Sequence, residues 1–191
     1  MRTVLRLSVA ACVLATVSAL ATVSAFAASA AVAEPPTNRV TFANLALTEM
    51  LTLDPSGVAV TAPAVGEPTQ AWDQVYATHL DTTPGFSSPY LLRNRATGTC
   101  LADVGDGLNV IAVECEASPA ADSAQLWQNH RVADRTVLGR DYYFRFNRAT
   151  GRVLTAVPGP ADTGARVVSA PAQPVSKSGA ADHQLWVMAR P

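Results

Sequence analysis

The side chains that most often carry catalysis are few in this chain, and they lie apart from one another. The three histidines are His79, His130 and His183. No His-Glu-x-x-His pair and no Gly-x-Ser-x-Gly sequence is present, and the acidic residues are scattered among segments typical of turns. We therefore expect that the chain is not an enzyme, that its histidines have solvated or hydrogen-bonded surface roles, and that it needs no metal and no cofactor.

The N-terminal segment, residues 1–33, is typical of a secretory signal peptide. Arg2 and Arg6 precede a long apolar run without an acid. Three small-x-small sequences offer cleavage sites, which end at Ala27, Ala30 and Ala33. A retained membrane anchor is one alternative, because the run is long enough to span a bilayer, and a lipoprotein with its lipid on Cys12 is another. We expect cleavage, which leaves residues 34–191 as a secreted domain without membrane contact.

Cys100 and Cys115 are the two cysteines that follow the N-terminal segment. An even number of cysteines in an exported chain favours a disulfide over a metal site. In the chain-entropy description, a disulfide that closes a loop of about 15 residues stabilises a fold by about 3 kcal/mol. Two buried free thiols are the alternative.

The charge balance narrows the range of partners. The chain carries 14 basic and 15 acidic residues, with a formal net charge of −1. No basic patch is visible, so nucleic acid is not an expected partner. Residues 34–191 fit one domain with a core of its own, and we expect a monomer. The excess of arginine over lysine and the alanine-rich leader suggest a bacterial exporter with a GC-rich genome.

Two short sequences recur along the chain and divide it into three units. The sequence NRATG stands at 94–98 and again at 147–151, and Asn44 begins a degenerate third copy. Gln-x-Trp holds all three tryptophans of the chain, with its residues at Gln70 and Trp72, Gln125 and Trp127, and Gln184 and Trp186. Regular recurrence of this kind indicates a repeat architecture, with units at approximately 38–80, 88–133 and 141–190.

The local pattern within each unit is that of strands. The runs PYLLRN and DYYFRFN are rich in aromatic residues and alternate in polarity, and each ends at an asparagine before a Thr-Gly turn. In that turn the glycine can adopt a positive φ without steric cost. No part of residues 34–191 shows sustained helical periodicity. We predict an all-β fold with pseudo-threefold symmetry and about four short strands in each unit.

The second unit resembles the repeat of the ricin B-type lectins. It combines Gly-x-Cys-Leu, a second cysteine and Gln-x-Trp, and the residues concerned are Gly98, Cys100, Leu101, Cys115, Gln125 and Trp127. The resemblance implies a β-trefoil, which is a barrel capped by a triangle of hairpins. A tryptophan fills such a core well, and a glutamine two residues earlier can bind neighbouring backbone groups. We expect all three Gln-x-Trp pairs to be structural.

The resemblance also implies positions for sugar contacts: an aspartate soon after Cys-Leu, an aromatic residue two before the second cysteine, and an asparagine before Gln-x-Trp. The second unit has Ala102, Val113 and Ala124 there, although Asp103 lies one residue beyond Ala102. Asp106 and Asn109 offer further polar groups. The other units have Thr52, Val60 and Thr69, and Thr155, Val168 and His183. The usual pockets are therefore largely erased, and a surviving carbohydrate site is expected at Asp103, Asp106 and Asn109.

Two functions follow from these observations. The first is a secreted, lectin-like module that binds an extracellular polysaccharide weakly. The second is a β-trefoil that binds another secreted protein, as a protease inhibitor does, without any affinity for sugar. The long units favour the second, because they include the exposed Pro/Ser/Gly loop Ala170–Asp182.

Overall fold

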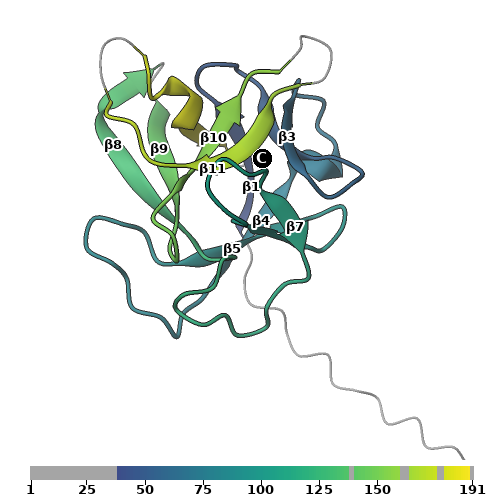
Figure 1. Ribbon diagram of the computed structural model, residues 1–191, viewed down its shortest axis with the longest axis vertical. Coiled ribbons are helices and arrows are strands. Elements are labelled where there is room, and N and C mark those ends of the chain that lie inside the picture. The colour runs from purple at the N-terminus through teal and green to yellow at the C-terminus, as the bar shows by residue number, and fades with distance from the viewer. Residues whose placement is uncertain (1–37, 138–139, 160–163, 176–178, 190–191) are drawn as a thin grey trace, which may run out of the picture. The chain divides into compact units, whose positions relative to one another are not determined.

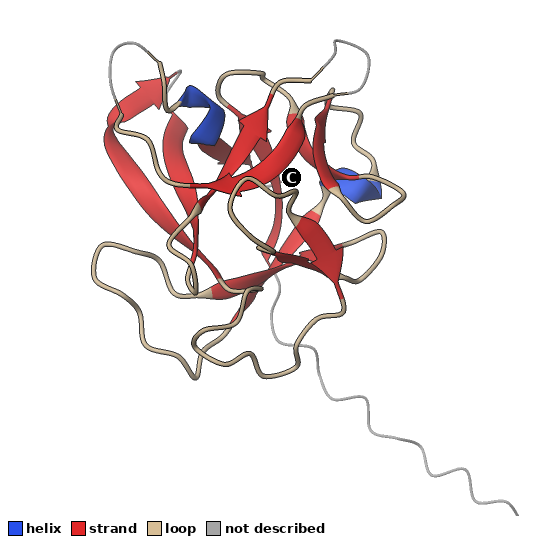
Figure 2. Cartoon of the chain, viewed as in Figure 1, coloured by secondary structure: helices blue, strands red, loops and turns tan. Residues whose placement is uncertain are grey.

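The computed structural model describes residues 38–137, 140–159, 164–175 and 179–189, with the side chains of 133–137 excepted. The predicted signal peptide lies outside these residues. The described part of the chain forms twelve strands and two short 3-10 helices (Figure 2). The strands are β1 (Asn38–Asn44), β2 (Met50–Leu53), β3 (Ala59–Ala62), β4 (Trp72–Tyr76), β5 (Tyr90–Asn94), β6 (Cys100–Ala102), β7 (Ile111–Val113), β8 (Trp127–Val137), β9 (Arg140–Asn147), β10 (Val153–Val157), β11 (Arg166–Ala170) and β12 (Trp186–Ala189). The helices, η1 (Pro68–Gln70) and η2 (Asp182–Gln184), precede β4 and β12.

Six of the strands close into a barrel. Each pairs in antiparallel fashion with the next around the circle β1, β4, β5, β8, β9 and β12, and β12 pairs back onto β1. The other six strands form the hairpins β2–β3, β6–β7 and β10–β11. Three antiparallel backbone β-bridges join these hairpins in a triangle. They pair Arg166 with Val60, Val58 with Ile111, and Asn109 with Val168.

This arrangement is the predicted β-trefoil, with lobes formed by β1–β4, β5–β8 and β9–β12 (Figure 1). Closure of the barrel removes the free strand edges that would otherwise remain in an all-β fold. None of the helices among the described residues has the length and apolar character needed to cross a membrane.

One tryptophan from each lobe enters the common core. Trp72, Trp127 and Trp186 are fully buried and belong to one apolar cluster. Each indole Nε1 donates a hydrogen bond to a leucine carbonyl in the second strand of its own lobe, at 3.2 Å to Leu51, 2.9 Å to Leu101 and 3.0 Å to Leu154. The indole therefore fills the core with its apolar body while its single polar group remains bonded.

The glutamine of each Gln-x-Trp pair fastens the loop that precedes it. The amide Nε2 donates to the carbonyls of Pro63 in lobe 1, Glu114 in lobe 2 and Pro171 in lobe 3. The amide Oε1 accepts from backbone N–H groups of the same loops, such as that of Glu116. Gln70, Gln125 and Gln184 are all buried, and each bonds through both ends of its amide.

The asparagines of the recurring turns link one lobe to the previous one. Each side-chain Oδ1 accepts from backbone N–H groups of its own turn. Each Nδ2 donates to the carbonyl of the residue before a Gln-x-Trp glutamine: Asn94 to Thr69, Asn147 to Ala124 and Asn44 to His183, at 2.9, 2.6 and 2.9 Å. Because Asn44 reaches the last lobe, these three bonds form a closed ring.

Thr48 shows that the degenerate first copy keeps the geometry of the other two. Its φ is 56°, against 73° at Gly98 and 69° at Gly151. In all three turns the N–H of this residue donates to the carbonyl of the asparagine four positions earlier, at 2.8 to 2.9 Å. The turn therefore forms even where a β-branched residue must adopt the left-handed conformation, which normally favours glycine.

The second lobe is further fixed by a covalent bond. Cys100 begins β6 and Cys115 follows β7, and the two form a disulfide across this hairpin. The predicted disulfide is thus present, and the alternative of two free thiols does not hold.

Candidate functional site

Asp103 lies between lobes 2 and 3 with its side chain fully buried. Its Oδ1 accepts from the N–H of Gly105 at 3.0 Å, and its Oδ2 accepts from the Thr150 hydroxyl and lies 3.3 Å from the Arg152 Nε. Burial raises the pKa of this carboxyl, but hydrogen bonds from Thr150, Gly105 and Ser169 and the charge of Arg152 outweigh burial and hold the pKa below its ordinary value.

The expected sugar contact of Asp103 conflicts with this environment. A carboxylate binds a sugar hydroxyl only if one of its oxygens faces the ligand, and both oxygens of Asp103 bond within the protein. We assign Asp103 to the contact between lobes, where it secures the second NRATG turn.

Asp106 and Asn109 lie in the same β6–β7 loop but have different surroundings. The Asp106 side chain is exposed, while its backbone forms a parallel β-bridge with Ser169 of β11. Asn109 bridges Val168, and its Oδ1 is buried without a hydrogen-bond partner. The exposed Asp106 carboxylate is the part of the predicted loop site that can reach a ligand, so a sugar contact there remains a prediction.

The lectin-like positions of lobe 1 do come together. Thr52, Val60 and Thr69 line a groove of about 600 Å³ that also includes Asp54 and Thr99, and we refer to it as the first-lobe groove. The Asp54 Oδ1 is already bonded to the N–H groups of Ser56 and Val58. The described lining residues include hydroxyls but no aromatic ring. The groove therefore offers hydrogen-bonding groups without a surface on which a sugar ring could stack.

The corresponding positions of lobe 3 are used within the protein. The Thr155 hydroxyl accepts from the Gln184 Nε2 at 3.1 Å, and Val168 is buried in the hairpin triangle. The His183 carbonyl accepts the Asn44 bond that closes the ring of lobes. Thr52 and Thr69 make the same two bonds in lobe 1. The lobes differ instead at the third position, where Val168 is buried and Val60 is half-buried.

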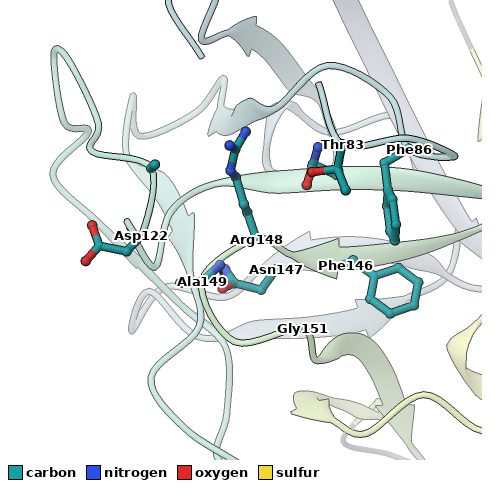
Figure 3. Close-up of a pocket in the computed structure, with 10 residues that line it drawn as sticks. Thr83, Phe86, Asp122, Phe146, Asn147, Arg148, Ala149 and Gly151 are labelled. Atoms are coloured by element: carbon teal, nitrogen blue, oxygen red, sulfur yellow. Dashed lines mark hydrogen bonds between the residues drawn. The ribbon is translucent and has the colours of Figure 1, made fainter. Parts of the chain in front are cut away.

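A second hollow combines aromatic rings with charged groups (Figure 3). We name it the aromatic depression; its volume is about 460 Å³, and it is lined by Thr83, Phe86, Ala121, Asp122, Gln128, Phe146, Asn147, Arg148, Ala149 and Gly151. In the view of Figure 3, Asp122 lies at one end, the two phenyl rings lie at the other, and Arg148 lies between them.

The aromatic depression is built from three segments that are distant in the sequence. Phe86 belongs to the loop between β4 and β5, and Asp122 belongs to the loop that precedes Gln125. Phe146 lies on β9, and Arg148 follows in the second NRATG turn. Contacts between lobes, rather than one local sequence, therefore create the site.

The rings of the aromatic depression hold one another in place. Phe86 and Phe146 meet edge to face, with centroids 5.2 Å apart and planes at 85°. Phe86 also packs on His130 at 5.1 Å, and the His130 Nδ1 lies 3.0 Å from the Gly85 carbonyl. Such aromatic contacts are favourable and hold the β4–β5 loop against the barrel.

The polar groups of the depression differ in availability. Arg148 uses Nη1 to donate to the Asp81 carbonyl at 2.8 Å, which holds its guanidinium at the wall. A guanidinium has five N–H donors, so this bond leaves others for a ligand. Asp122 is exposed and can accept hydrogen bonds. The depression thus supplies donors, acceptors and apolar faces together.

Sequence reasoning missed the aromatic depression. Phe86, Asp122, Phe146 and Arg148 are absent from the residues expected to bind sugar. The one available signal was the aromatic run before the second NRATG, because it places phenyl groups beside a turn. Among the residues that the structure describes, no three or more His, Cys, Asp or Glu side chains are grouped so that they could hold a metal ion.

Comparisons with known proteins support the fold. No protein-family model matches the chain, and no curated protein matches it. Three of the similar solved structures are a designed three-fold symmetric protein, ThreeFoil (20% identity, TM-score 0.57, covering 80% of this chain and 99% of that one), the ricin B-like lectin of Macrolepiota procera in complex with lactose (19%, 0.54, 80% and 95%), and the Polyporus squamosus lectin bound to a human-type influenza-binding epitope (16%, 0.57, 82% and 50%). At these identities the comparisons confirm the predicted β-trefoil.

Proposed function

We propose that this β-trefoil is a secreted, lectin-like module that binds an extracellular polysaccharide weakly through its aromatic depression. The observation that carries the proposal is the meeting of the Phe86 and Phe146 rings with Asp122 and Arg148 around one hollow of about 460 Å³. A sugar ring has apolar C–H faces and polar edges, and a site with aromatic walls and a few placed polar groups suits both.

The weakness of the proposed binding has a physical reason. Asp122 is exposed and its carboxylate is well hydrated, so each bond to a sugar hydroxyl replaces a bond to water and gains little. Two phenyl rings supply the apolar contact, and both are half-buried by their neighbours. Repeated sugar units along a polysaccharide would offer this single site many equivalent places to bind, which raises the apparent affinity in proportion to their number.

Further support comes from the leader and from the lectin neighbours. Residues 1–33 have the pattern of a signal peptide, and the Cys100–Cys115 disulfide is suited to an oxidising compartment. The Macrolepiota procera lectin, which has the same fold, is described in complex with lactose. Catalysis forms no part of this proposal, and a monomeric state remains a prediction.

Retention on galactose, xylan and chitin columns tests the proposal. Asp122→Asn should lower the affinity about two- to threefold, because the variant weakens a hydrogen bond that gains little over hydration and does not disturb the core. Asp106→Asn is the competing variant, because it removes the exposed carboxylate on which the predicted β6–β7 loop site depends; if the aromatic depression is the site, this variant should leave retention unchanged. Full flow-through on every matrix would remove the carbohydrate proposal, and loss of retention only in Asp106→Asn would move the site to that loop.

A protein-binding role is the second candidate, and the β6–β7 loop favours it. Val104 and Leu108 are 46% and 55% exposed on this loop. The loop is held by the bond from the Gly107 N–H to the Ser169 carbonyl at 2.8 Å, and a fixed loop with exposed apolar side chains suits protein recognition. A protease panel tests this role: inhibition that is lost in Leu108→Asp would support it, and undiminished cleavage by every protease would count against inhibition.

A further inference from the structure

One core position breaks the threefold symmetry of the barrel. The residue two places before the turn asparagine is Phe42 in lobe 1, Leu92 in lobe 2 and Arg145 in lobe 3. All three are buried, with exposures of 1%, 0% and 1%. Two lobes therefore place an apolar side chain where the third places a cation, and a buried cation is costly unless it is paired.

Aromatic rings and one hydrogen-bond acceptor contact part of the Arg145 guanidinium. Its central carbon lies 4.6 Å from the centroid of the Phe42 ring and 5.1 Å from that of the Tyr143 ring, which covers it with aromatic surface. Its Nη1 donates to the Oδ1 of Asn129, which also accepts from the Tyr90 hydroxyl. Burial is the main influence on the pKa of Arg145 and lowers it, but a guanidinium keeps its proton in proteins.

The remaining edge of the guanidinium has no partner. Both Nε and Nη2 of Arg145 are buried without a hydrogen-bond acceptor. These two N–H groups lie on the same side of the planar group, in the fork arrangement with which arginine binds carboxylates and other anions side-on. Within the described part of the chain no carboxylate pairs with Arg145; Asp73, the acid of β4, pairs with Arg93 and Arg95.

A third donor without a partner belongs to the same cluster. The Nε2 of Gln74 is buried without an acceptor, while the Gln74 Oε1 lies 3.5 Å from the Tyr76 hydroxyl. The Tyr76 ring packs edge to face on the Tyr90 ring, with centroids 5.9 Å apart, and the Tyr90 hydroxyl shares the Asn129 Oδ1 with Arg145. Gln74 and Arg145 therefore belong to one cluster of polar groups. The cluster thus contains three free donors and a net positive charge. A water molecule would satisfy the donors only, whereas an anion would satisfy the donors and the charge.

We propose that the barrel binds a small monovalent anion at the Nε–Nη2 edge of Arg145 and the side-chain amide of Gln74, as an internal part of the fold. Chloride is the probe, because it is a small monovalent anion that accepts several N–H bonds. The anion takes the place that a buried carboxylate would fill in a conventional ion pair. This site is separate from the surface depression and does not depend on sugar binding.

Thermal unfolding in two salts at equal ionic strength tests the proposal. Sodium chloride should raise the Tm of the protein by about 3 °C over sodium gluconate, whose anion is too large to be enclosed. Arg145→Leu, which copies Leu92 of lobe 2, should abolish this difference, and Gln74→Leu should reduce it. Arg131→Leu is the surface control, since Arg131 is exposed and paired with Asp141, and it should keep the full difference.

Equal Tm values in the two salts would overturn the proposal, as would an undiminished chloride effect in Arg145→Leu. If Arg145→Leu does not fold, bromide in crystals of the unaltered protein decides the matter. An anomalous bromide peak beside the Arg145 Nε and Nη2 would support the site, and a peak-free position filled by water would overturn it.

Discussion

The three lobes of this β-trefoil are alike in the core and different at the surface. In the core, each lobe repeats one bonding pattern, in which an indole donates to a leucine carbonyl and a glutamine amide fastens a loop. At the surface, the positions expected to contact sugar form a hydroxyl-lined groove in lobe 1, while Asp103 in lobe 2 bonds across to the next lobe. The aromatic depression, in turn, draws its residues from loops that belong to different lobes.

The difference shows which positions can change independently. A core residue that meets its counterparts on the axis is constrained by the other two lobes, because a change of volume there disturbs a packed interior. A loop residue at the rim of a hollow has solvent on one side, so one lobe can lose or gain a side chain without affecting the others. Arg145 is the exception, since it is a core residue that departs from its two counterparts.

The largest effect is expected in the core. Replacing Trp127 with alanine should reduce the free energy of unfolding by about 3–5 kcal/mol, because it empties a fully buried volume and leaves the Leu101 carbonyl without its donor. Trp72→Ala and Trp186→Ala should have similar effects if the lobes are equivalent. Urea denaturation measures all three. A cost below about 1 kcal/mol in one lobe would show that this lobe does not share the common core.

An intermediate effect is expected at Asp103. Asp103→Asn should cost about 1–3 kcal/mol at neutral pH, since it weakens the buried bonds to Thr150 and Arg152. The folded pKa of this carboxyl lies below its ordinary value, so its stabilisation is present above the unfolded pKa of about 4 and is lost as the pH falls through the folded pKa.

Unfolding of the two proteins at a series of pH values checks this prediction. The difference in free energy of unfolding between the unaltered protein and Asp103→Asn should be constant from neutral pH to about 5 and should shrink below about 4. A difference that widens on acidification would contradict it. The same variant should be retained on a sugar column as the unaltered protein is, because the carboxylate is buried.

The smallest effect is expected at Thr48, and it should be stabilising. Thr48 adopts the positive φ that glycine adopts in the other two turns, so Thr48→Gly should relieve strain worth about 1 kcal/mol. Differential scanning calorimetry should show a higher Tm. The converse change, Gly151→Thr, is the matched control and should lower the Tm, while a loss of stability in Thr48→Gly would mean that the first turn is not equivalent to the others.

Much of the fold could be predicted from the sequence because its repeating elements use local signals. An asparagine followed by a Thr-Gly turn and a Gln-x-Trp pair are each recognisable within a few residues of sequence and recur once per lobe, so their recurrence predicts three lobes and a shared core. The same reasoning extends to Thr48, because an alignment based on Asn44 places it in one column with Gly98 and Gly151.

The candidate site could not be predicted in the same way. Phe86 and Phe146 become neighbours only because the β4–β5 loop folds over β9, and no local pattern records that contact. Asp103 lies near the position that the lectin resemblance implies, but its burial depends on Thr150 and Arg152 in the next lobe. Likewise, alternation in DYYFRFN does not reveal that Arg145 faces inward without a carboxylate.

The ring of asparagine bonds between lobes has a consequence for how the chain could be rearranged. Asn44 reaches the His183 carbonyl just as Asn94 and Asn147 reach the lobe before them, and β1 pairs directly with β12. The ring has no first member, so the described architecture does not depend on which lobe is translated first. A circularly permuted gene that joins β12 to β1 through a short linker and opens the exposed loop between β4 and β5 should still encode a folded trefoil.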